Sequence, residues 1–235
     1  VLTGAEILRR ISAQYDGWPP VTVRLVDWAD EEGARFGKSL FGSSACAGSL
    51  DMVEARGLKD RDGIGLPEAL RQVGIDFERV KDSGKELKNA AAYIELHIEQ
   101  GPVLNEIDLP LGIVTSINGG VRFQCEVIGM ASHAGTTPMG RRRDAAAAVA
   151  ELALYVEQRA AGVPDVVGTI GLLQVPNGSI NVVPGRCSFS LDLRATTNAA
   201  RDALAVDVLA ELGAICRRRG LSFTLEETMR ASAAP

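Results

Sequence analysis

The sequence predicts an α/β domain joined to a smaller α+β domain of ferredoxin-like topology, and two observations support this prediction. Up to residue 117, β-rich apolar runs alternate with helical patterns, as in a sheet covered by helices. From there to residue 231 the patterns follow the β-α-β-β-α-β order of the split unit. We therefore expect two domains, residues 1–117 and 118–231, with a boundary near residue 118.

The composition excludes several function classes. Of the 235 residues, 46% are hydrophobic and 23% are charged, with a net charge of -5, so the chain can bury a core and has no basic footprint for nucleic acid. Aromatic residues make up 5%, which argues against base stacking. No apolar run is long enough to span a membrane. The four cysteines lie far apart without a CxxC pair, which argues against a zinc knuckle and indicates a reducing cytoplasm.

In the first domain, three β-rich runs are expected to form strands of one sheet. They are Val21–Val26, Ala91–His97 and Leu111–Ile117. Short helices are expected before and between them: one that carries Ile7, Leu8 and Ile11 on one face, one of small residues capped by Gly42-Ser43-Ser44, and one at Pro67–Val73.

In the second domain, the strands and helices have clearer boundaries. Strands are expected at Val121–Ile128, Val166–Leu173, Arg186–Arg194 and Leu221–Glu227. In the third of these, Cys187, Phe189, Leu191 and Leu193 alternate with polar residues and share one face. An alanine-rich helix is expected at Arg141–Ala160, and a longer helix is expected to run from a Thr197-Asn198 cap to Gly220.

A histidine ends the second expected strand. His97 alternates with apolar neighbours and precedes Gly101-Pro102, where Pro102 suits the first turn of a helix. The carboxyl ends of strands in α/β sheets are where ligands gather. A lone histidine is more often a hydrogen-bonded structural residue, so this position alone leaves both interpretations open.

An acidic run follows the first expected strand. Asp30, Glu31 and Glu32 lie in sequence before Gly33. Most such runs are solvated turns, and taken alone this one favours that interpretation. The functional alternative is that one carboxylate binds a metal while its neighbour acts as a general base.

Three stretches, taken together, resemble one protein family. They are Asp30–Gly37 with Gly42-Ser43 after it, His97–Pro102, and Gly129–Met139 closing with Arg142–Ala145. In this order they resemble the amidase/hydantoinase–carbamoylase branch of the M20 metallopeptidase-like family. That branch includes N-carbamoyl-L-amino acid hydrolases, β-ureidopropionase-type enzymes and allantoate amidohydrolases. The resemblance covers nearly the whole chain.

The resemblance implies an architecture and a set of site residues. Residues 1–117 would be part of a catalytic domain with two divalent ions, zinc or manganese. Residues 118–231 would be an inserted lid that also forms a homodimer contact. The resemblance implies that Glu31 is the general base and that Glu32 and His97 are metal ligands. It also implies that His133 is a lid residue that reaches the reacting centre in the partner subunit's site. The implied substrate contacts are Gln100, Arg122, Asn181 and Arg194.

Simpler structural roles are open for some of these residues. Arg122 and Arg194 lie on expected strands and could belong to the lid surface, although the motif favours the functional role. The Arg141–Arg143 run is expected to be mostly solvated charge at a helix start, with one member paired to Asp144.

The chain departs from the family pattern in its metal ligands. The resemblance implies an upstream His-x-Asp, a bridging aspartate and a downstream histidine, whereas this sequence has only two histidines, His97 and His133. We therefore expect a fragment that is inactive by itself, with apolar sheet edges left open.

The leading functional hypothesis is metal-dependent hydrolysis of a linear C–N bond of N-carbamoyl-L-amino acids, through a metal-activated water with Glu31 as the general base. Three alternatives stay open: an allantoate amidohydrolase, an aminoacylase or peptidase of the same family, and a non-catalytic dimerisation or small-ligand module. The arginine and asparagine set favours a small acidic substrate over a peptide.

Overall fold

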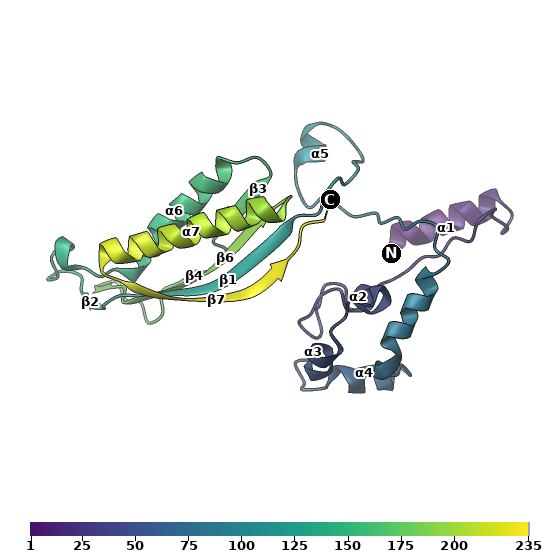
Figure 1. Ribbon diagram of the computed structural model, residues 1–235, viewed down its shortest axis with the longest axis horizontal. Helices are drawn as coiled ribbons and strands as arrows, with labels where there is room; N and C mark the ends of the chain where they lie inside the picture. Colours follow the sequence, from purple (N-terminus) through teal and green to yellow (C-terminus); the bar gives the residue numbers. More distant parts are fainter. Residues whose placement is uncertain (235) are drawn as a thin grey trace. The chain divides into compact units, whose positions relative to one another are not determined.

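The computed structural model describes residues 1–234. The chain divides into two compact units, Val1–Val103 and Leu104–Pro235, which are described separately here (Figure 1). This division falls before the boundary expected near residue 118. Residues 104–118 lead into a five-stranded sheet, the first strand of which begins at Gly119.

The first unit is built from short helices around a small aromatic core. Its helices are α1 (Leu2–Gln14), α2 (Phe41–Ala47), α3 (Met52–Gly57), α4 (Leu66–Gln72) and the 3₁₀ helix η1 (Phe77–Leu87), and α5 (Val103–Glu106) lies at the junction of the units. The buried cluster centres on Phe36, Phe41, Leu50, Leu66 and Phe77. Helix α2 begins at Phe41, just before its expected cap, after Leu40 in the left-handed region at φ 63°.

The three strands expected in the first domain are not formed. Residues 21–26, 91–97 and 111–116 run without ladder pairing among the described residues, and Ile117 makes only an isolated bridge to Ala234. Their apolar side chains are largely exposed, up to 90% for Ile94 and 93% for Ile113. A strand is stabilised by the backbone hydrogen bonds of its neighbours, so a β-rich run without a neighbour stays unpaired. The expected α/β sheet is therefore absent from residues 1–117 as described.

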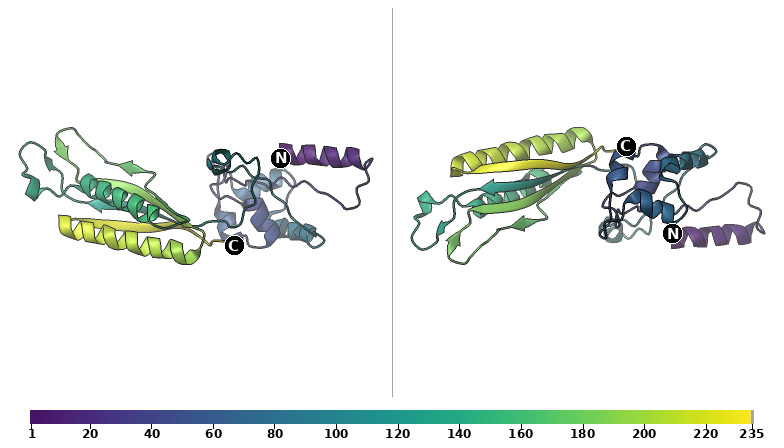
Figure 2. Two further views of the ribbon diagram at one scale, coloured as in Figure 1. Left: turned by 90° about the horizontal axis from the view of Figure 1, so that it is seen from above. Right: turned by 90° about the horizontal axis from the view of Figure 1, so that it is seen from below.

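The second unit contains an antiparallel sheet with two helices on one face. The strand order is β3-β6-β1-β7, where β3 is Val166–Thr169, β6 is Arg186–Ala195, β1 is Gly119–Ile128 and β7 is Ser222–Ala231. Helices α6 (Ala145–Ala161) and α7 (Asn198–Arg219) lie along the sheet (Figure 2). Apart from the two-residue strands β2 (Ser132–His133), β4 (Leu173–Gln174) and β5 (Val182–Val183), the element order is the expected β-α-β-β-α-β.

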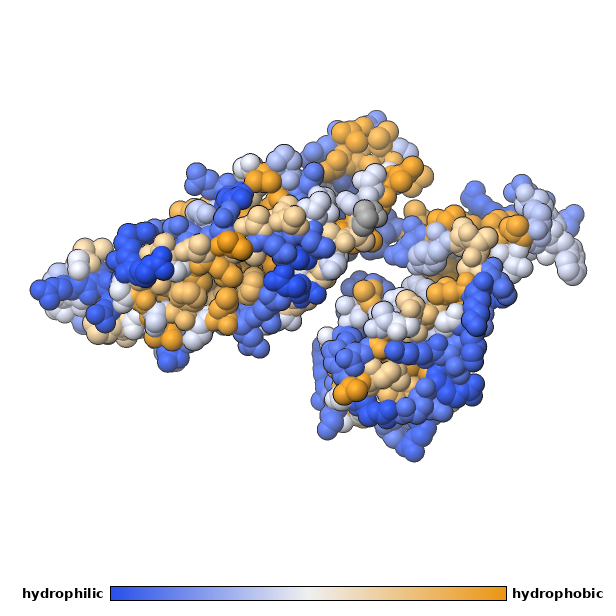
Figure 3. All heavy atoms as spheres, in the orientation of Figure 1, coloured by the Kyte–Doolittle hydropathy of each residue, from blue (hydrophilic) through white to orange (hydrophobic). Residues whose placement is uncertain are grey.

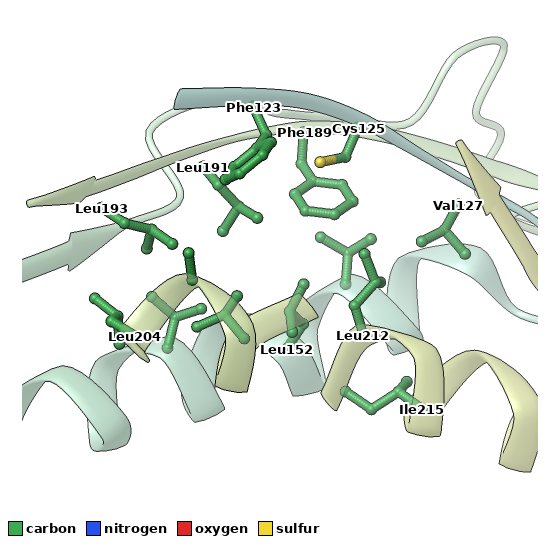
Figure 4. Packing of buried hydrophobic residues seen from close by; sticks show 14 of the residues in the cluster. Phe123, Cys125, Val127, Leu152, Phe189, Leu191, Leu193, Leu204, Leu212 and Ile215 are labelled. Atoms are coloured by element: carbon green, nitrogen blue, oxygen red, sulfur yellow. The ribbon is translucent and has the colours of Figure 1, made fainter. Parts of the chain in front are cut away.

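The core of the second unit lies between the sheet and the helices. The face of β6 predicted to be apolar is fully buried, because Cys187, Phe189, Leu191 and Leu193 all have exposed fractions of 0%. They meet Leu152 from α6 and Leu212 from α7 (Figure 4). Each apolar side chain buried in this way contributes roughly 1.5–3 kcal/mol relative to exposure.

The ends of the long helix follow its local sequence. The Thr197 hydroxyl accepts a hydrogen bond from the Ala200 backbone N–H at 3.2 Å, which confirms the expected cap of α7. Gly220 ends the helix in the left-handed region at φ 67°, where glycine is least strained. Within residues 1–234, no helix is both long and apolar enough to cross a membrane.

Candidate functional site

Two of the predicted site residues meet at one end of the second unit. Strand β2 pairs with β5 in antiparallel register, with His133 opposite Val182. The Ala134 backbone N–H donates to the Asn181 carbonyl oxygen at 2.9 Å. This short ladder therefore holds the exposed side chains of His133 and Asn181 on neighbouring segments.

The local hydrogen bonds determine what these two side chains can offer. The Gly135 backbone N–H donates to His133 Nδ1 at 3.1 Å, so the neutral ring carries its proton on Nε2. The Ser179 hydroxyl donates to Asn181 Oδ1 at 2.9 Å, which leaves the Asn181 amide NH₂ to donate elsewhere. His133 and Asn181 thus each keep a free hydrogen-bond donor, although the register places His133 opposite Val182 and Asn181 opposite Ala134, so that the two side chains belong to alternate faces of the ladder.

A second group of predicted residues gathers on the sheet face opposite the helices. Asp192 accepts from Arg122 Nε at 2.9 Å and, through both of its oxygens, from Arg194 at 2.8 Å. Arg122 and Arg194 therefore stand side by side with one carboxylate between them. They line a pocket of about 540 Å³ together with Asn118, Gln124, Thr169, Ser190 and Thr228.

Electrostatic coupling stabilises this group in its charged form. The Arg194 guanidinium is the main cause of a lowered pKa of Asp192; burial of the carboxyl opposes this shift and Arg122 adds to it. In return, Asp192 raises the pKa of Arg194. Two guanidinium groups around one carboxylate leave one net positive charge, together with unused N–H donors. That combination suits the carboxylate of a small acid.

The two groups lie toward opposite ends of β1, one on the five-stranded sheet and the other on the separate two-stranded sheet of β2 and β5. Arg122 is near the start of β1, opposite Asp192 on β6, whereas the β2–β5 ladder follows the other end of β1 at Ile128. Six residue steps along the strand lead from Arg122 to Ile128, or about 20 Å at the usual rise per residue. The structure therefore brings the predicted residues of this unit together in two groups.

The acidic run lies in a turn of the first unit. The carboxylates of Glu31 and Glu32 are exposed. The turn is held by Asp30, whose backbone carbonyl accepts from Gly33 N–H at 3.2 Å. A side chain at Gly33, at φ 68°, would place its Cβ 2.6 Å from Ser39 N, so only glycine fits there. Arg35 ties this turn to the helical core through Asp60, 3.0 Å away.

His97 is exposed and in the opposite neutral tautomer to that of His133. Its Nδ1 lies 2.5 Å from the Ile98 carbonyl oxygen, which can only accept, so Nδ1 carries the proton and Nε2 keeps its lone pair. A free Nε2 with Nδ1 bonded to a carbonyl is the usual state of a metal-ligating histidine. Gln100 is also exposed, in the left-handed region at φ 56°.

The described side chains include ligand types that suit a metal ion, but too few of them lie together. Carboxylate and imidazole, as offered by Glu32 and His97, are common ligands of zinc and manganese. Within residues 1–234, however, no three His, Cys, Asp or Glu side chains lie close enough to hold an ion. A catalytic zinc ion normally takes three protein ligands, so the described residues do not complete a metal site.

Asp192 is the site residue that the motif reasoning missed. Residues two apart on a strand share a face, so the spacing of Asp192 and Arg194 already placed them together. The pairing of Asp192 with Arg122 could not be read from spacing, because it depends on the register between β1 and β6.

Comparison with known proteins gives a consistent set of relatives. The model of the peptidase family M20/M25/M40 matches residues 1–230. The chain is 39% identical to an N-carbamoyl-L-amino acid amidohydrolase of Geobacillus stearothermophilus, over 96% of this chain and 55% of that protein. It is 32% identical to an allantoate amidohydrolase of Bacillus subtilis, over 100% of this chain and 57% of that protein.

Solved structures show the same likeness. A hydantoinase/carbamoylase family amidase from Burkholderia multivorans matches with a TM-score of 0.84 and 29% identity, over 100% of this chain and 56% of that one. The chain thus spans about half the length of the curated relatives it matches, among them the Geobacillus protein at 55%.

Proposed function

Because this chain belongs to the peptidase family M20/M25/M40, we propose that the protein containing it hydrolyses the linear C–N bond of N-carbamoyl-L-amino acids. The observation that carries the proposal is the exposed His133 ring on β2, where the Gly135 N–H bond to Nδ1 leaves Nε2–H as a free donor. A ureido carbonyl attacked by water gains negative charge on its oxygen. A hydrogen-bond donor held at that oxygen stabilises the charge more in the transition state than in the ground state.

The arginine group supports an acidic substrate. Arg122 and Arg194 share Asp192, yet each keeps N–H donors that face the 540 Å³ pocket. A single α-carboxylate can accept from both guanidinium groups. This favours a small N-substituted amino acid over a peptide, whose carboxylate lies farther from most of its amide bonds.

The acidic turn supports a role in proton transfer. We propose that Glu31 accepts a proton from the attacking water and returns it to the leaving nitrogen, while Glu32 and His97 contribute to holding divalent metal ions. When bound, such ions make water a stronger nucleophile and polarise the carbonyl. The exposed Glu31 carboxylate and the free Nε2 of His97 are compatible with these roles.

Allantoate is the second candidate substrate. The allantoate amidohydrolase of Bacillus subtilis is similar over the full chain, and allantoate also combines ureido groups with a carboxylate. A non-catalytic binding module is the alternative of another class, supported by the incomplete set of metal ligands among residues 1–234. We also propose a reducing, cytoplasmic setting, because all four cysteines are buried free thiols.

An assay that measures ammonia from the ureido substrates and free amino acid from the N-acetyl amino acids tests these candidates. The whole protein, loaded with Mn²⁺ or Zn²⁺, is given N-carbamoyl-L-amino acids, allantoate and N-acetyl amino acids at equal concentrations. We expect kcat/KM to be highest for an N-carbamoyl-L-amino acid. A higher value for allantoate would select the second candidate. Substrate binding without turnover of any of the three would select the non-catalytic module.

We further propose that the protein acts as a homodimer through its second unit. A small substrate cannot touch both His133 and Arg194 on one chain if about 20 Å of strand separates their groups. A second copy can supply the missing group. Strand β7 pairs only with β1 among the described strands, and an open groove lies between β7 and α7. Apolar residues gather at the surface of the second unit (Figure 3). The groove is lined by Leu209, Cys216, Leu221 and Phe223.

Mixing two inactive variants tests the shared site. His133→Ala and Arg194→Ala proteins are each expected to lose activity, and dimers reassembled from an equal mixture should regain roughly a quarter of the wild-type rate. The reason is that half of the dimers are mixed, and each mixed dimer has one intact site. The measurement is ammonia release after subunit exchange.

The control is a mixture in which both mutations are on the same chain and the partner chain is wild type. If both groups acted from one chain, the two single variants would show no recovery on mixing. That result, in a protein shown to be dimeric by light scattering, would contradict the proposed shared site.

A further inference from the structure

Arg142 differs from both of its arginine neighbours. Arg141 and Arg143 have exposed side chains without a side-chain hydrogen bond or ion pair among residues 1–234, whereas Arg142 is half-buried. The expected pairing of one member of this run with Asp144 is not found, because the Asp144 carboxylate caps α6 by accepting from Ala147 N–H at 3.0 Å. Within the arginine run, Arg142 is therefore the residue whose environment differs from that of a solvated surface charge.

Arg142 binds the loop that carries His133. Its guanidinium donates to the Ala134 carbonyl oxygen at 2.7 Å and to the Thr137 carbonyl oxygen at 3.1 Å. These two carbonyls bracket Gly135 and Thr136, directly after His133. One planar group thus spans the loop with two charge-assisted hydrogen bonds, which a single ammonium group could not reproduce in the same geometry.

The same loop determines the state of the His133 ring. Gly135 lies inside the span bridged by Arg142, and its N–H is the donor that keeps Nδ1 unprotonated. The approach is close, because a Cβ on Gly135 would lie 3.2 Å from His133 Cε1. Thr137 N–H closes the loop on the other side by donating to the His133 carbonyl oxygen at 3.1 Å. A shift of the carbonyls held by Arg142 would therefore move the Gly135 N–H away from the ring.

We propose that Arg142 is a positioning residue, which holds the loop from Ala134 to Thr137 so that the His133 Nε2–H points at the reacting carbonyl. The inference rests on the proposed function of His133. It adds a residue that touches no substrate and acts through the conformation of a loop. A small error in the position of a hydrogen-bond donor is sufficient to slow a reaction strongly.

The test compares Arg142→Gln and Arg142→Lys with the matched control Arg141→Gln in the whole protein. We expect Arg142→Gln to lower kcat roughly tenfold to hundredfold while KM changes by less than about threefold. Arg142→Lys should recover part of kcat, because lysine keeps the charge and can reach one carbonyl. Arg141→Gln should match the wild type.

A second readout does not depend on turnover. In NMR spectra, Arg142→Gln should speed hydrogen exchange of the Gly135 amide at least about tenfold and shift the Nδ1 resonance of His133, without altering the amides of β1 and β6. The His133 ring signals can be assigned in the whole protein by their absence from the spectrum of a His133→Gln variant. The NMR measurement tests the role of Arg142 even if the protein turns over no ureido substrate. In that case the proposed function is contradicted, while the positioning role of Arg142 is still tested.

Two results would overturn the inference. The first is an Arg142→Gln protein with wild-type kcat and unchanged Gly135 exchange. The second is a uniform rise in exchange across the second unit together with a lower Tm, because Arg142 would then support the fold as a whole and not the His133 loop.

Discussion

Replacing His133 by alanine is expected to lower kcat of the whole protein by roughly 10²- to 10³-fold, the usual cost of removing one donor from an oxyanion site. KM should change little, because the lost hydrogen bond is strongest in the transition state. The expectation follows from the Gly135 N–H bond to Nδ1, which leaves Nε2–H as the only donor of the neutral ring. The measurement is steady-state ammonia release.

Ser132→Ala is the matched control for this variant. Ser132 precedes His133 on β2, and its buried hydroxyl has no hydrogen-bond partner among the described residues. Its removal should leave kcat within about threefold of wild type, since no hydrogen bond is lost. A loss smaller than tenfold in His133→Ala, with normal folding, would show that His133 does not stabilise the reacting carbonyl.

Replacing Phe189 by alanine is expected to destabilise the second unit by about 3–5 kcal/mol. Phe189 lies on β6 with an exposed fraction of 0%, between the sheet and both helices, so truncation removes buried contacts and leaves a cavity (Figure 4). Both residue groups of the site are attached to this sheet, so the loss should also weaken substrate binding. The measurement is urea unfolding followed by circular dichroism.

Leu154→Ala on α6 is the control, because Leu154 is 70% exposed and should change stability by no more than about 0.5 kcal/mol. Phe189→Leu keeps most of the buried volume and should cost less than alanine. Equal losses for Phe189→Ala and Leu154→Ala would mean that the β6 face does not form the core of this unit.

Local patterns in the sequence predicted most of the second unit. The alternation of Cys187, Phe189, Leu191 and Leu193 predicted a strand with one buried face, and the structure buries all four. The Thr197 cap and the Gly220 stop bound α7 as expected. These features could be predicted from the sequence because helix capping, a left-handed glycine and the two-residue alternation of a strand each depend on residues only a few positions apart.

The strands expected in residues 1–117 could not be predicted in the same way. Val21–Val26, Ala91–His97 and Leu111–Ile117 have strong β patterns, yet only the last residue of these runs makes even an isolated bridge. A β pattern indicates that a segment would fit a half-buried sheet. It does not show that another strand is available to pair with that segment. Strand pairing depends on residues far apart in the sequence, so in residues 1–117 the pattern and the structure disagree.

For the candidate site, sequence motifs and the family resemblance pointed to side chains of suitable chemistry: Glu31, Glu32, His97, Gln100, Arg122, His133, Asn181 and Arg194. Which of them lie on neighbouring segments depends on the fold. The β2–β5 ladder joins His133 to Asn181, and the β1–β6 register brings Arg122 to Asp192 beside Arg194. The tautomers of both histidines depend on hydrogen bonds to backbone groups, the Ile98 carbonyl for His97 and the Gly135 N–H for His133. The hydrogen bonds of Arg142 to its loop likewise depend on backbone carbonyls that the folded chain positions. Residue type sets what a side chain can donate or accept, whereas register and loop geometry set its partner.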